Sequence, residues 1–344
     1  MEILCRWRHD GAMRVFVTHN PEDRTAYYGR SLPELEVIAD VVLNPLDRDL
    51  TTNELIEHAA GCDVIVAHRS TPGEAELFEA LDGTLKAFLR CAVDISTIDV
   101  DAASAHGVLV GQADKSYIAS TAELALGLYL DTARNIATST AAYRSEVEPN
   151  QLTGSQIAGK TAGIIGFGAI GSYLAQMLAA LGVDVLVHDP FVDVPEEFEQ
   201  LALDPLLERS DVVFPLAPAN PATLDFISTH ELSVMKPGAT LINVSRGELV
   251  DEDAVVAALD SGHLGALGMD VGRAHDQRPS PHLAKRPNVV ATPHLGGLTQ
   301  ENADAQAASS VEQISAMLAG EMPPRTVNAD HARQLRQYWE SRSR

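Results

Sequence analysis

Residues 161–189 of the chain read TAGIIGFGAIGSYLAQMLAALGVDVLVHD. A short apolar run at the start predicts a buried parallel strand, and three glycines follow it in G-x-G-x-x-G spacing. An apolar-faced helix and a second buried strand come next, and the second strand ends at Asp189, 18 positions after Gly171. This order predicts a strand–helix–strand unit that binds a dinucleotide, whereas the same unit without a nucleotide is the less common case for so complete a match.

The three glycines each meet a physical requirement of such a unit. Gly166 permits the tight turn from strand to helix, and Gly171 lets the helix approach the strand closely. Gly168 has no side chain, so a pyrophosphate can lie against the backbone there. The phosphates are expected at the free N–H groups of the helix start, around Ala169 and Ile170, where the helix dipole is positive.

Asp189 indicates which dinucleotide is bound. Its carboxylate is expected to accept hydrogen bonds from the adenosine ribose hydroxyls and to repel a 2′-phosphate. The residues that follow His188 read DPFVDVPEE and contain no Arg or Lys that would neutralise such a phosphate. NAD is therefore favoured over NADP as the cofactor.

The overall composition excludes several classes of protein. The chain has 344 residues, of which 45% are hydrophobic, and its net charge of −23 argues against binding to nucleic acid or to an anionic membrane. No apolar run reaches the ~20 residues of a membrane helix, and charges interrupt the N-terminal segment where a secretory signal would be apolar. Cys5, Cys62 and Cys91 are too widely spaced for a metal motif or a disulfide framework. We expect a cytoplasmic protein without a metal.

The order of elements predicts an α/β fold with two lobes. Residues 13–117 and 298–344 are expected to form the substrate domain, residues 118–297 the NAD-binding domain, and residues 1–12 a flexible extension. The nucleotide lobe is thus inserted into the substrate lobe, and a cleft between lobes is where cofactor and substrate are expected to meet. In the first lobe we predict strands at 14–18, 37–42, 63–67, 85–90 and 108–110, and helices at 22–29, 52–60, 73–81 and 100–105. A long, largely buried helix at 118–143 and another at 299–318 are expected to connect the lobes.

Three motifs downstream of the glycines point to one family. Residues 242–247 read INVSRG, residues 268–271 read GMDV and residues 292–297 read TPHLGG, each at the end of a predicted strand. Their order and spacing resemble the D-isomer-specific 2-hydroxyacid dehydrogenases, which include D-3-phosphoglycerate dehydrogenase and glyoxylate/hydroxypyruvate reductases. The resemblance covers about residues 13–328. It implies two Rossmann-like lobes, of which the substrate lobe is flavodoxin-like, and a homodimer joined through the nucleotide lobes.

The resemblance also implies roles for individual residues. Arg246 matches the family's arginine that binds the substrate carboxylate and carbonyl, and its alternative is a surface salt bridge to Glu248 or Asp251. His294 matches the proton donor and acceptor, whereas a histidine taken alone is more often structural. Asp270 matches the acceptor for the nicotinamide amide, and its alternative is a cap or a loop anchor. Further cofactor contacts are expected at the following residues: Pro218, Thr223, Val244 and Gly296.

The chain departs from the family at the residue that assists the histidine. The family has a glutamate five residues after the Asp of its D-V motif, and here that position is His275. A neutral imidazole can orient His294, but it does not favour its protonated form as a carboxylate does. Asp276 lies one residue further on and could take the place of the glutamate if the loop is shifted. We expect His275 as the third catalytic residue and leave Asp276 as the alternative.

The substrate loops also depart from the family pattern. Where the family has R-x-G-x-G, this chain has Arg90-Cys91-Ala92-Val93-Asp94. Ala92, Val93 and Asp94 could still bind a substrate carboxylate through backbone amides, but the charge of Asp94 disfavours a doubly anionic substrate such as 3-phosphoglycerate. Arg69 lies one position after the phosphate-facing arginine of phosphoglycerate dehydrogenases, and its alternative is a solvated loop charge.

Three functions remain open at this point. The leading one is an NAD-dependent oxidoreductase that transfers a hydride between NAD(H) and a small D-2-hydroxy or 2-keto acid. The second is an NAD-sensing protein that keeps the fold without turnover, which the missing glutamate favours. The third is a formate-dehydrogenase-like enzyme, for which the chain lacks a clear Gln paired with the histidine.

Overall fold

The computed structural model describes residues 12–342, which divide into two compact units. Unit 1 contains the described residues up to Ser116 together with those from Gln300 onward, and unit 2 is the continuous segment Tyr117–Thr299. The expected flexible extension at residues 1–12, which includes Cys5, lies outside the described residues, apart from Ala12 itself. The role of each unit in binding substrate or cofactor stays a prediction at this stage.

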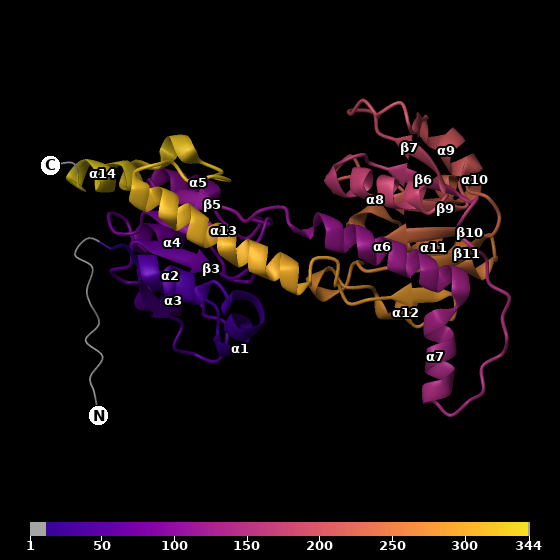
Figure 1. The fold of residues 1–344 in the computed structure, drawn as a ribbon, viewed down its shortest axis with the longest axis horizontal. Coiled ribbons are helices and arrows are strands. Elements are labelled where there is room, and N and C mark those ends of the chain that lie inside the picture. The colour runs from indigo at the N-terminus through magenta and orange to yellow at the C-terminus, as the bar shows by residue number, and fades with distance from the viewer. Residues whose placement is uncertain (1–11, 343–344) are drawn as a thin grey trace. The chain divides into compact units, whose positions relative to one another are not determined.

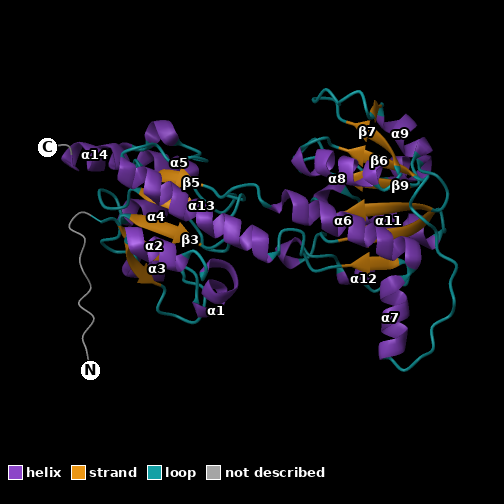
Figure 2. Cartoon of the chain, viewed as in Figure 1, coloured by secondary structure: helices purple, strands orange, loops and turns teal. Residues whose placement is uncertain are grey.

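Unit 1 is built around a five-stranded sheet with the order β2-β1-β3-β4-β5. All neighbouring strands in it are parallel, for example β1 and β3, where Val15 pairs with Val64. This is the flavodoxin-like order, in which β2 is added on one side of β1 and β3 on the other, so the order of strands switches between β1 and β3. The strands, shown in Figures 1 and 2, are β1 (Arg14–Val17), β2 (Asp40–Leu43), β3 (Val64–Ala67), β4 (Ala87–Arg90) and β5 (Leu109–Gly111).

The central strands of unit 1 are apolar because helices cover both faces of the sheet. β3 and β4 are buried along their whole length, and two separate apolar clusters lie on the two faces. The helices of this unit are α1 (Pro21–Asp23), α2 (Leu32–Ile38), α3 (Thr52–His58), α4 (Ala75–Ala80), α5 (Val100–Ala105), α13 (Gln300–Ala319) and α14 (Arg333–Arg342), with the π-helical turn η1 (Arg24–Tyr28) and the 3-10 turn η4 (Ala329–His331).

One predicted strand of unit 1 is wrong in its position. The expected strand 37–42 begins inside α2, and the observed strand β2 starts only at Asp40. Pro33 at the second position of α2 sets up the helix, and the apolar residues Val37 and Ile38 complete its last turn. The predicted helix 22–29 is likewise divided, because a π-helical turn follows Asp23.

Unit 2 is built around a seven-stranded sheet with the order β12-β11-β10-β9-β6-β7-β8. The strands are all parallel. Successive strands are added in one direction from β6 to β8 and in the opposite direction from β9 to β12, so the order switches between β6 and β9, as in the Rossmann fold. The predicted α/β fold class is therefore confirmed for both units. The strands are β6 (Thr161–Ile165), β7 (Asp184–His188), β8 (Glu199–Gln200), β9 (Val212–Pro215), β10 (Ala239–Asn243), β11 (Leu264–Met269) and β12 (Val289–Ala291).

The helices of unit 2 lie on both faces of this sheet. Among them α6 packs against α8, β10 and β11, and it belongs wholly to this unit (Figure 1). They are α6 (Tyr117–Arg134), α7 (Ile136–Arg144), α8 (Ala169–Ala180), α9 (Leu203–Arg209), α10 (Thr229–Val234), α11 (Glu252–Asp260) and α12 (Pro281–Ala284), with the 3-10 turns η2 (Gly247–Leu249) and η3 (His275–Gln277).

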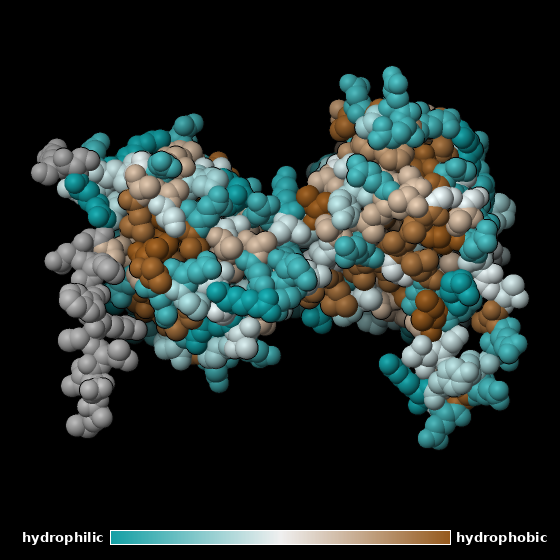
Figure 3. All heavy atoms as spheres, viewed as in Figure 1, coloured by the Kyte–Doolittle hydropathy of each residue, from teal (hydrophilic) through white to brown (hydrophobic). Residues whose placement is uncertain are grey.

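The predicted single helix at 118–143 is wrong, because the chain breaks between α6 and α7. Asn135 adopts a left-handed conformation with φ 56°, which asparagine tolerates better than most residues. The second half is also not buried, since α7 has no buried residue. Within residues 12–342 no helix combines the length and apolarity needed to span a membrane. Hydrophilic and apolar side chains are mixed on the visible surface of each unit (Figure 3).

Candidate functional site

The glycine turn between β6 and α8 has the geometry that a dinucleotide requires. Gly166 has φ +100°, and a Cβ atom there would lie 2.7 Å from the backbone nitrogen of Ala217. A Cβ atom on Gly171 would lie 2.1 Å from the carbonyl oxygen of Gly166. Both positions therefore exclude larger residues because neighbouring backbone occupies the space.

Gly168 differs from these two glycines, and the difference suits a bound pyrophosphate. A Cβ atom at Gly168 would meet nothing within 4 Å, so the space beside the helix start is open. Gly168 caps α8 without a side chain, which leaves the first helical N–H groups, including those of Ala169 and Ile170, available to an anion. The turn lies where β6 and β9 diverge, which is the crevice that holds ligands in open α/β sheets.

Asp189 is held beside this turn by two backbone amides. Its Oδ2 accepts a hydrogen bond from Phe167 N at 2.8 Å, and its Oδ1 accepts one from Phe191 N at 2.9 Å. Each carboxylate oxygen has a further lone pair, so the group can also accept from ribose hydroxyls. The amides fix the carboxylate at the end of β7, next to the glycines.

The other predicted cofactor residues lie at the carboxyl ends of neighbouring strands. Pro218 and Thr223 follow β9, and the Thr223 hydroxyl donates to the Pro218 carbonyl at 2.7 Å. Val244 follows β10 and is buried. Since the carboxyl ends of β6, β9 and β10 share one edge of the sheet, these residues stand on the same side as the glycine turn.

Arg246 is extended and follows β10 by three residues, and its side chain is not engaged by a carboxylate in the described chain. Its Nη1 donates to the carbonyl of Ser245 at 2.9 Å. Asp251 is occupied as the N-cap of α11, and Glu248 Oε2 is buried without a hydrogen-bond partner among the described residues. Within the described residues Arg246 thus forms no ion pair with Glu248 or Asp251, which was its alternative, and its role at the substrate stays a prediction.

Asp251 gives this segment a pH-dependent contribution to stability. Hydrogen bonds from Ala254 N and then from the Ser228 hydroxyl lower the pKa of Asp251 below its usual 3.8. As the pH falls below about 3.8, the unfolded chain takes up a proton at this residue before the folded chain does, so the contribution is lost.

We expect Asp251→Asn to remove that part of the acid sensitivity. The difference in free energy of unfolding between wild type and variant should shrink as the pH is lowered from 6 to about 3, in urea titrations. Asp193→Asn, in an exposed loop, is the control and should show a constant difference. A difference for Asp251→Asn that does not change with pH would contradict the assignment.

Asp270 anchors the loop that carries His294. Its side chain is fully buried and accepts hydrogen bonds from the Thr292 hydroxyl at 2.6 Å, Leu295 N at 2.7 Å and Gly296 N at 2.8 Å. Its carbonyl accepts from His294 N at 2.9 Å. These contacts are those of the loop anchor that we named as its alternative role, and a contact between Asp270 and a nicotinamide remains a prediction.

The His294 ring is oriented by a backbone carbonyl. Its Nδ1 lies 3.0 Å from the carbonyl oxygen of Asp276, so Nδ1 carries a proton and donates it. Nε2 is then the nitrogen that is able to exchange a proton with a substrate. The partner is thus the main chain of Asp276, which neither of our two expectations for this position foresaw, and the role of the His275 side chain remains a prediction.

The loop that supplies this carbonyl has an unusual backbone. Asp276 and Gln277 both have positive φ, at 58° and 55°, and His294 itself has φ 62°. Two of the seven such non-glycine residues in the described chain therefore form this hydrogen bond, and a third, Gln277, directly follows Asp276. Left-handed residues of this kind cost on the order of 1 kcal/mol each and gather at functional sites, so their convergence marks this loop. The sequence contained no motif for it.

In unit 1, the predicted substrate residues lie in loops that follow β3 and β4. Asp94 Oδ1 accepts a hydrogen bond from Ser96 N at 2.8 Å, and the Ala92 carbonyl accepts one from Ala113 N at 3.0 Å, with Val93 between them. Arg69 is exposed on the preceding loop. The substrate roles of all four residues remain predictions.

Arg90, which the sequence did not single out for a role, organises these loops. Its side chain is 1% exposed, and it donates to the carbonyls of His68 at 2.5 Å, Arg69 at 2.6 Å and Thr71 at 2.8 Å. A fourth bond goes to the Thr97 hydroxyl at 2.9 Å. Burial lowers the pKa of Arg90 to about 10. A single guanidinium thus holds both loops at the carboxyl edge of the sheet.

Unit 2 combines the Rossmann strand order with an open glycine turn and an acidic residue that ends the second strand. Those features define an NAD-binding α/β domain. Residues 126–296 match the family model of the D-isomer specific 2-hydroxyacid dehydrogenase, NAD binding domain. The chain belongs to the D-isomer specific 2-hydroxyacid dehydrogenase family.

Similar proteins extend this comparison beyond unit 2. D-3-phosphoglycerate dehydrogenase of Mycobacterium leprae is 38% identical over 283 residues, which are 80% of this chain and 53% of that protein. The chain spans about half the length of the curated relatives it matches. The crystal structure of D-lactate dehydrogenase with NAD+ from Lactobacillus jensenii is 26% identical with a TM-score of 0.78, covering 92% of this chain and 99% of that one. The apo-structure of D-lactate dehydrogenase from Escherichia coli is also 26% identical, with a TM-score of 0.79 and coverage of 92% and 100%.

Proposed function

We propose that this chain is an NAD-dependent oxidoreductase that interconverts a small D-2-hydroxy acid and the corresponding 2-keto acid. The observation that carries the proposal is the hydrogen bond from His294 Nδ1 to the Asp276 carbonyl, because it leaves Nε2 for proton exchange. The names of the relatives, which include D-3-phosphoglycerate and D-lactate dehydrogenases, support the same reaction class.

The residues divide the reaction between them. NAD, when bound, supplies the hydride chemistry at the substrate carbon. Arg246 binds the substrate carboxylate through its planar guanidinium and polarises the carbonyl. His294 donates a proton from Nε2 to the oxygen during reduction and removes it during oxidation. The glycine turn holds the pyrophosphate of the cofactor, and Asp189 holds its adenosine ribose.

The substrate we propose carries a single negative charge. Asp94 replaces a family glycine at the loop expected to bind the carboxylate. Its negative charge would repel a second anionic group on the substrate. A panel of 2-hydroxy and 2-keto acids, with 3-phosphoglycerate and formate included, tests this by NADH absorbance. Turnover of a singly charged acid is expected; NAD binding without any turnover would favour an NAD-sensing protein instead.

The choice of cofactor should depend on Asp189. We expect NAD to bind far more tightly than NADP in calorimetry, because a fixed carboxylate would face the 2′-phosphate with no Arg or Lys in the residues that follow it. Asp189→Ala should reduce that preference at least tenfold. Asp193→Ala, in the same loop region but without contact to the turn, is the matched control. Equal wild-type affinity for the two cofactors would contradict the proposal.

We further propose that the protein is a homodimer joined through unit 2, with α7 as part of the interface. α7 has no buried residue in the isolated chain, although it carries large apolar side chains. Of these, Ile136 is 54% exposed and Tyr143 is 68% exposed. Apolar side chains on a helix with no intramolecular partner are typical of a surface that a second copy covers.

Introducing charge on α7 should therefore dissociate the dimer. The double variant Ile136→Glu/Tyr143→Glu is expected to elute as a monomer in light-scattering chromatography at micromolar concentration. Val37→Glu changes a similarly exposed residue of unit 1 and should leave the mass unchanged. A wild-type monomer, or a dimer that survives the double change, would contradict this interface.

A further inference from the structure

The carboxyl edge of the unit 1 sheet contains a cluster of charged side chains that the proposed reaction does not use. The sheet order changes direction between β1 and β3, and loops from both strands lead away from that point. In open α/β sheets this is the position where ligands bind. Asp23 and His68 follow β1 and β3, and Asp49 follows the neighbouring strand β2.

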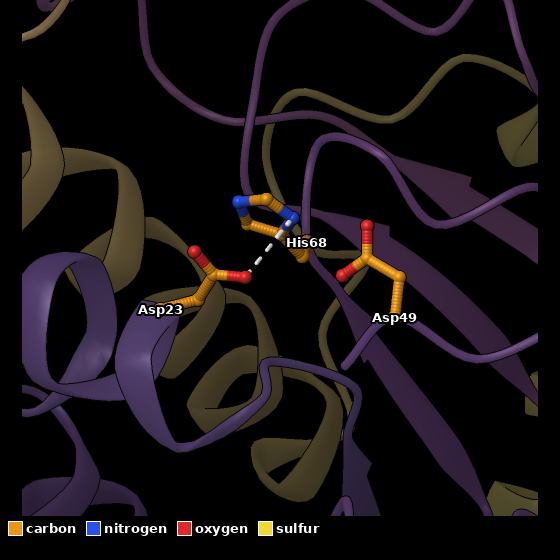
Figure 4. A group of neighbouring side chains, drawn as sticks. All are labelled: Asp23, Asp49 and His68. Atoms are coloured by element: carbon orange, nitrogen blue, oxygen red, sulfur yellow. Dashed lines mark ion pairs between the residues drawn. The ribbon is translucent and has the colours of Figure 1, made fainter. Parts of the chain in front are cut away.

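These three side chains approach one another closely (Figure 4). One potential ligand atom from each of Asp23, Asp49 and His68 lies within 4.8 Å of the others. His68 Nδ1 is 3.9 Å from Asp23 Oδ2, and the imidazole side chain is only 12% exposed. Two carboxylates and an imidazole, from the end of α1 and from the loops after β2 and β3, thus converge on one point.

Protein cations do not neutralise the two carboxylates. In residues 12–342, neither Asp23 nor Asp49 forms an ion pair with a lysine or arginine, and the partner of Asp23 is His68 itself. Arg24 and Arg90 are close by, but both donate to backbone carbonyls. The arrangement therefore concentrates negative charge around a single imidazole.

A buried polar atom beside the cluster also has no partner in the described chain. His19 is 1% exposed, and its Nδ1 is buried without a hydrogen bond. Its ring centroid is 5.0 Å from that of His68, with the two rings edge to face. A buried nitrogen normally finds a protein or water partner, so this atom marks an unfilled hydrogen-bonding position in the core that adjoins the cluster.

The loops that carry the cluster are held in place before any ligand binds. The Thr18 hydroxyl accepts from His68 N at 2.9 Å and contacts the Thr71 hydroxyl at 2.7 Å. Asn20 accepts from Asp23 N at 3.0 Å and its amide donates to Asp23 Oδ2 at 2.7 Å. Fixed ligand loops reduce the entropy lost when an ion binds.

Ser70 connects the other two members of the cluster. Its hydroxyl donates to Asp49 Oδ2 at 2.7 Å and lies 2.8 Å from His68 Nδ1. It therefore aligns a carboxylate and the imidazole with each other.

We propose that Asp23, Asp49 and His68 bind one divalent transition-metal ion, with zinc preferred over magnesium and calcium. A mixed imidazole and carboxylate set suits zinc, whereas magnesium and calcium favour oxygen ligands alone. Three protein ligands leave a coordination position for water or a carboxylate oxygen. This site goes beyond the proposed dehydrogenase function and does not depend on it.

The test is titration of the full chain, stripped with a chelator, with zinc chloride by calorimetry. The buffer contains 0.5 M potassium chloride, because salt screens weak binding to the acidic surface. The parent chain carries Cys5→Ser and His9→Ala, so that these two residues of the N-terminal segment contribute no zinc ligands. One zinc per chain is expected, bound at least tenfold more tightly than magnesium or calcium.

Three variants assign the site. Zinc is expected to raise the melting temperature of the parent chain, because it binds the folded state. Asp23→Asn, Asp49→Asn and His68→Ala should each weaken zinc binding at least tenfold and abolish that rise. His230→Ala is the matched control, because His230 pairs with Asp204 on the exposed surface of unit 2. Asp49 is exposed, so its variant should fold even if His68→Ala does not. The absence of saturable binding, or binding that Asp49→Asn leaves unchanged, would overturn the proposal.

Discussion

Replacing His294 with alanine is expected to reduce turnover by about 10²- to 10⁴-fold, the usual contribution of a positioned acid/base group. NAD affinity should change little, because the glycine turn and Asp189, which we propose hold the cofactor, follow other strands of unit 2. The measurement compares kcat with any acid that the wild type turns over, together with cofactor binding by calorimetry. His230→Ala, an exposed histidine of the same unit, is the control.

Variants of the neighbouring loop separate the possible partners of His294. If the Asp276 carbonyl orients the ring, Asp276→Asn should keep most of the turnover, because asparagine retains the carbonyl and tolerates φ 58°. Asp276→Val should be damaging, since a β-branched residue resists that conformation. A large loss in Asp276→Asn would instead assign the role to the carboxylate, and full turnover in His294→Ala would refute the mechanism.

Replacing Arg90 with methionine should lower the free energy of unfolding by about 3 kcal/mol. Three backbone carbonyls, of which that of Thr71 is buried, lose their charged donor, at about 1–3 kcal/mol for a buried one and less for the two partly buried ones. The removed cost of burying the guanidinium offsets part of that loss. Urea unfolding measures the change. Arg209→Met is the matched control, because Arg209 forms a two-armed pair with Glu199 on the exposed surface, and its loss should lower the stability far less.

A second substitution makes the Arg90 result specific. Arg90→Lys keeps the charge but offers a single nitrogen to the four acceptors. Its free energy of unfolding should therefore lie between those of the wild type and Arg90→Met. Equal stability of Arg90→Met and Arg209→Met would show that the guanidinium does not hold the loops.

The sequence predicted the features that depend on local pattern. The glycine turn, the acidic end of β7 and the parallel α/β order follow from glycine spacing and apolar runs, and these agree with the structure. The α6–α7 break did not follow from pattern, because Asn135 is compatible with a helix until tertiary packing favours its left-handed conformation. The position of β2 was missed for a related reason, since Val37 and Ile38 favour a strand by type and yet complete α2.

The sequence named the side chains of the candidate site, whose roles stay predictions, and gave no signal for its main-chain contacts. Arg246 and His294 are recognisable because a side-chain type recurs at a defined place in a motif. The acceptor for His294 is a carbonyl, and any residue at position 276 would supply one, so no residue type signals it. Arg90 holds carbonyls in the same way, and the cluster of Asp23, Asp49 and His68 combines separate segments without a spacing signal.

The interrupted chain of unit 1 has a consequence for synthesis. Strands β1, β3 and β4 leave the ribosome early, but the apolar cluster on one face of their sheet is completed by Ile314 and Met317 of α13 and by Leu335 of α14. At about 5–20 residues per second, some 10–40 s pass between the two segments. Unit 2 is continuous and can fold during that interval, whereas the first segment must wait with an uncovered sheet face. The nascent chain is thus most exposed to aggregation and to chaperones before its last helices emerge.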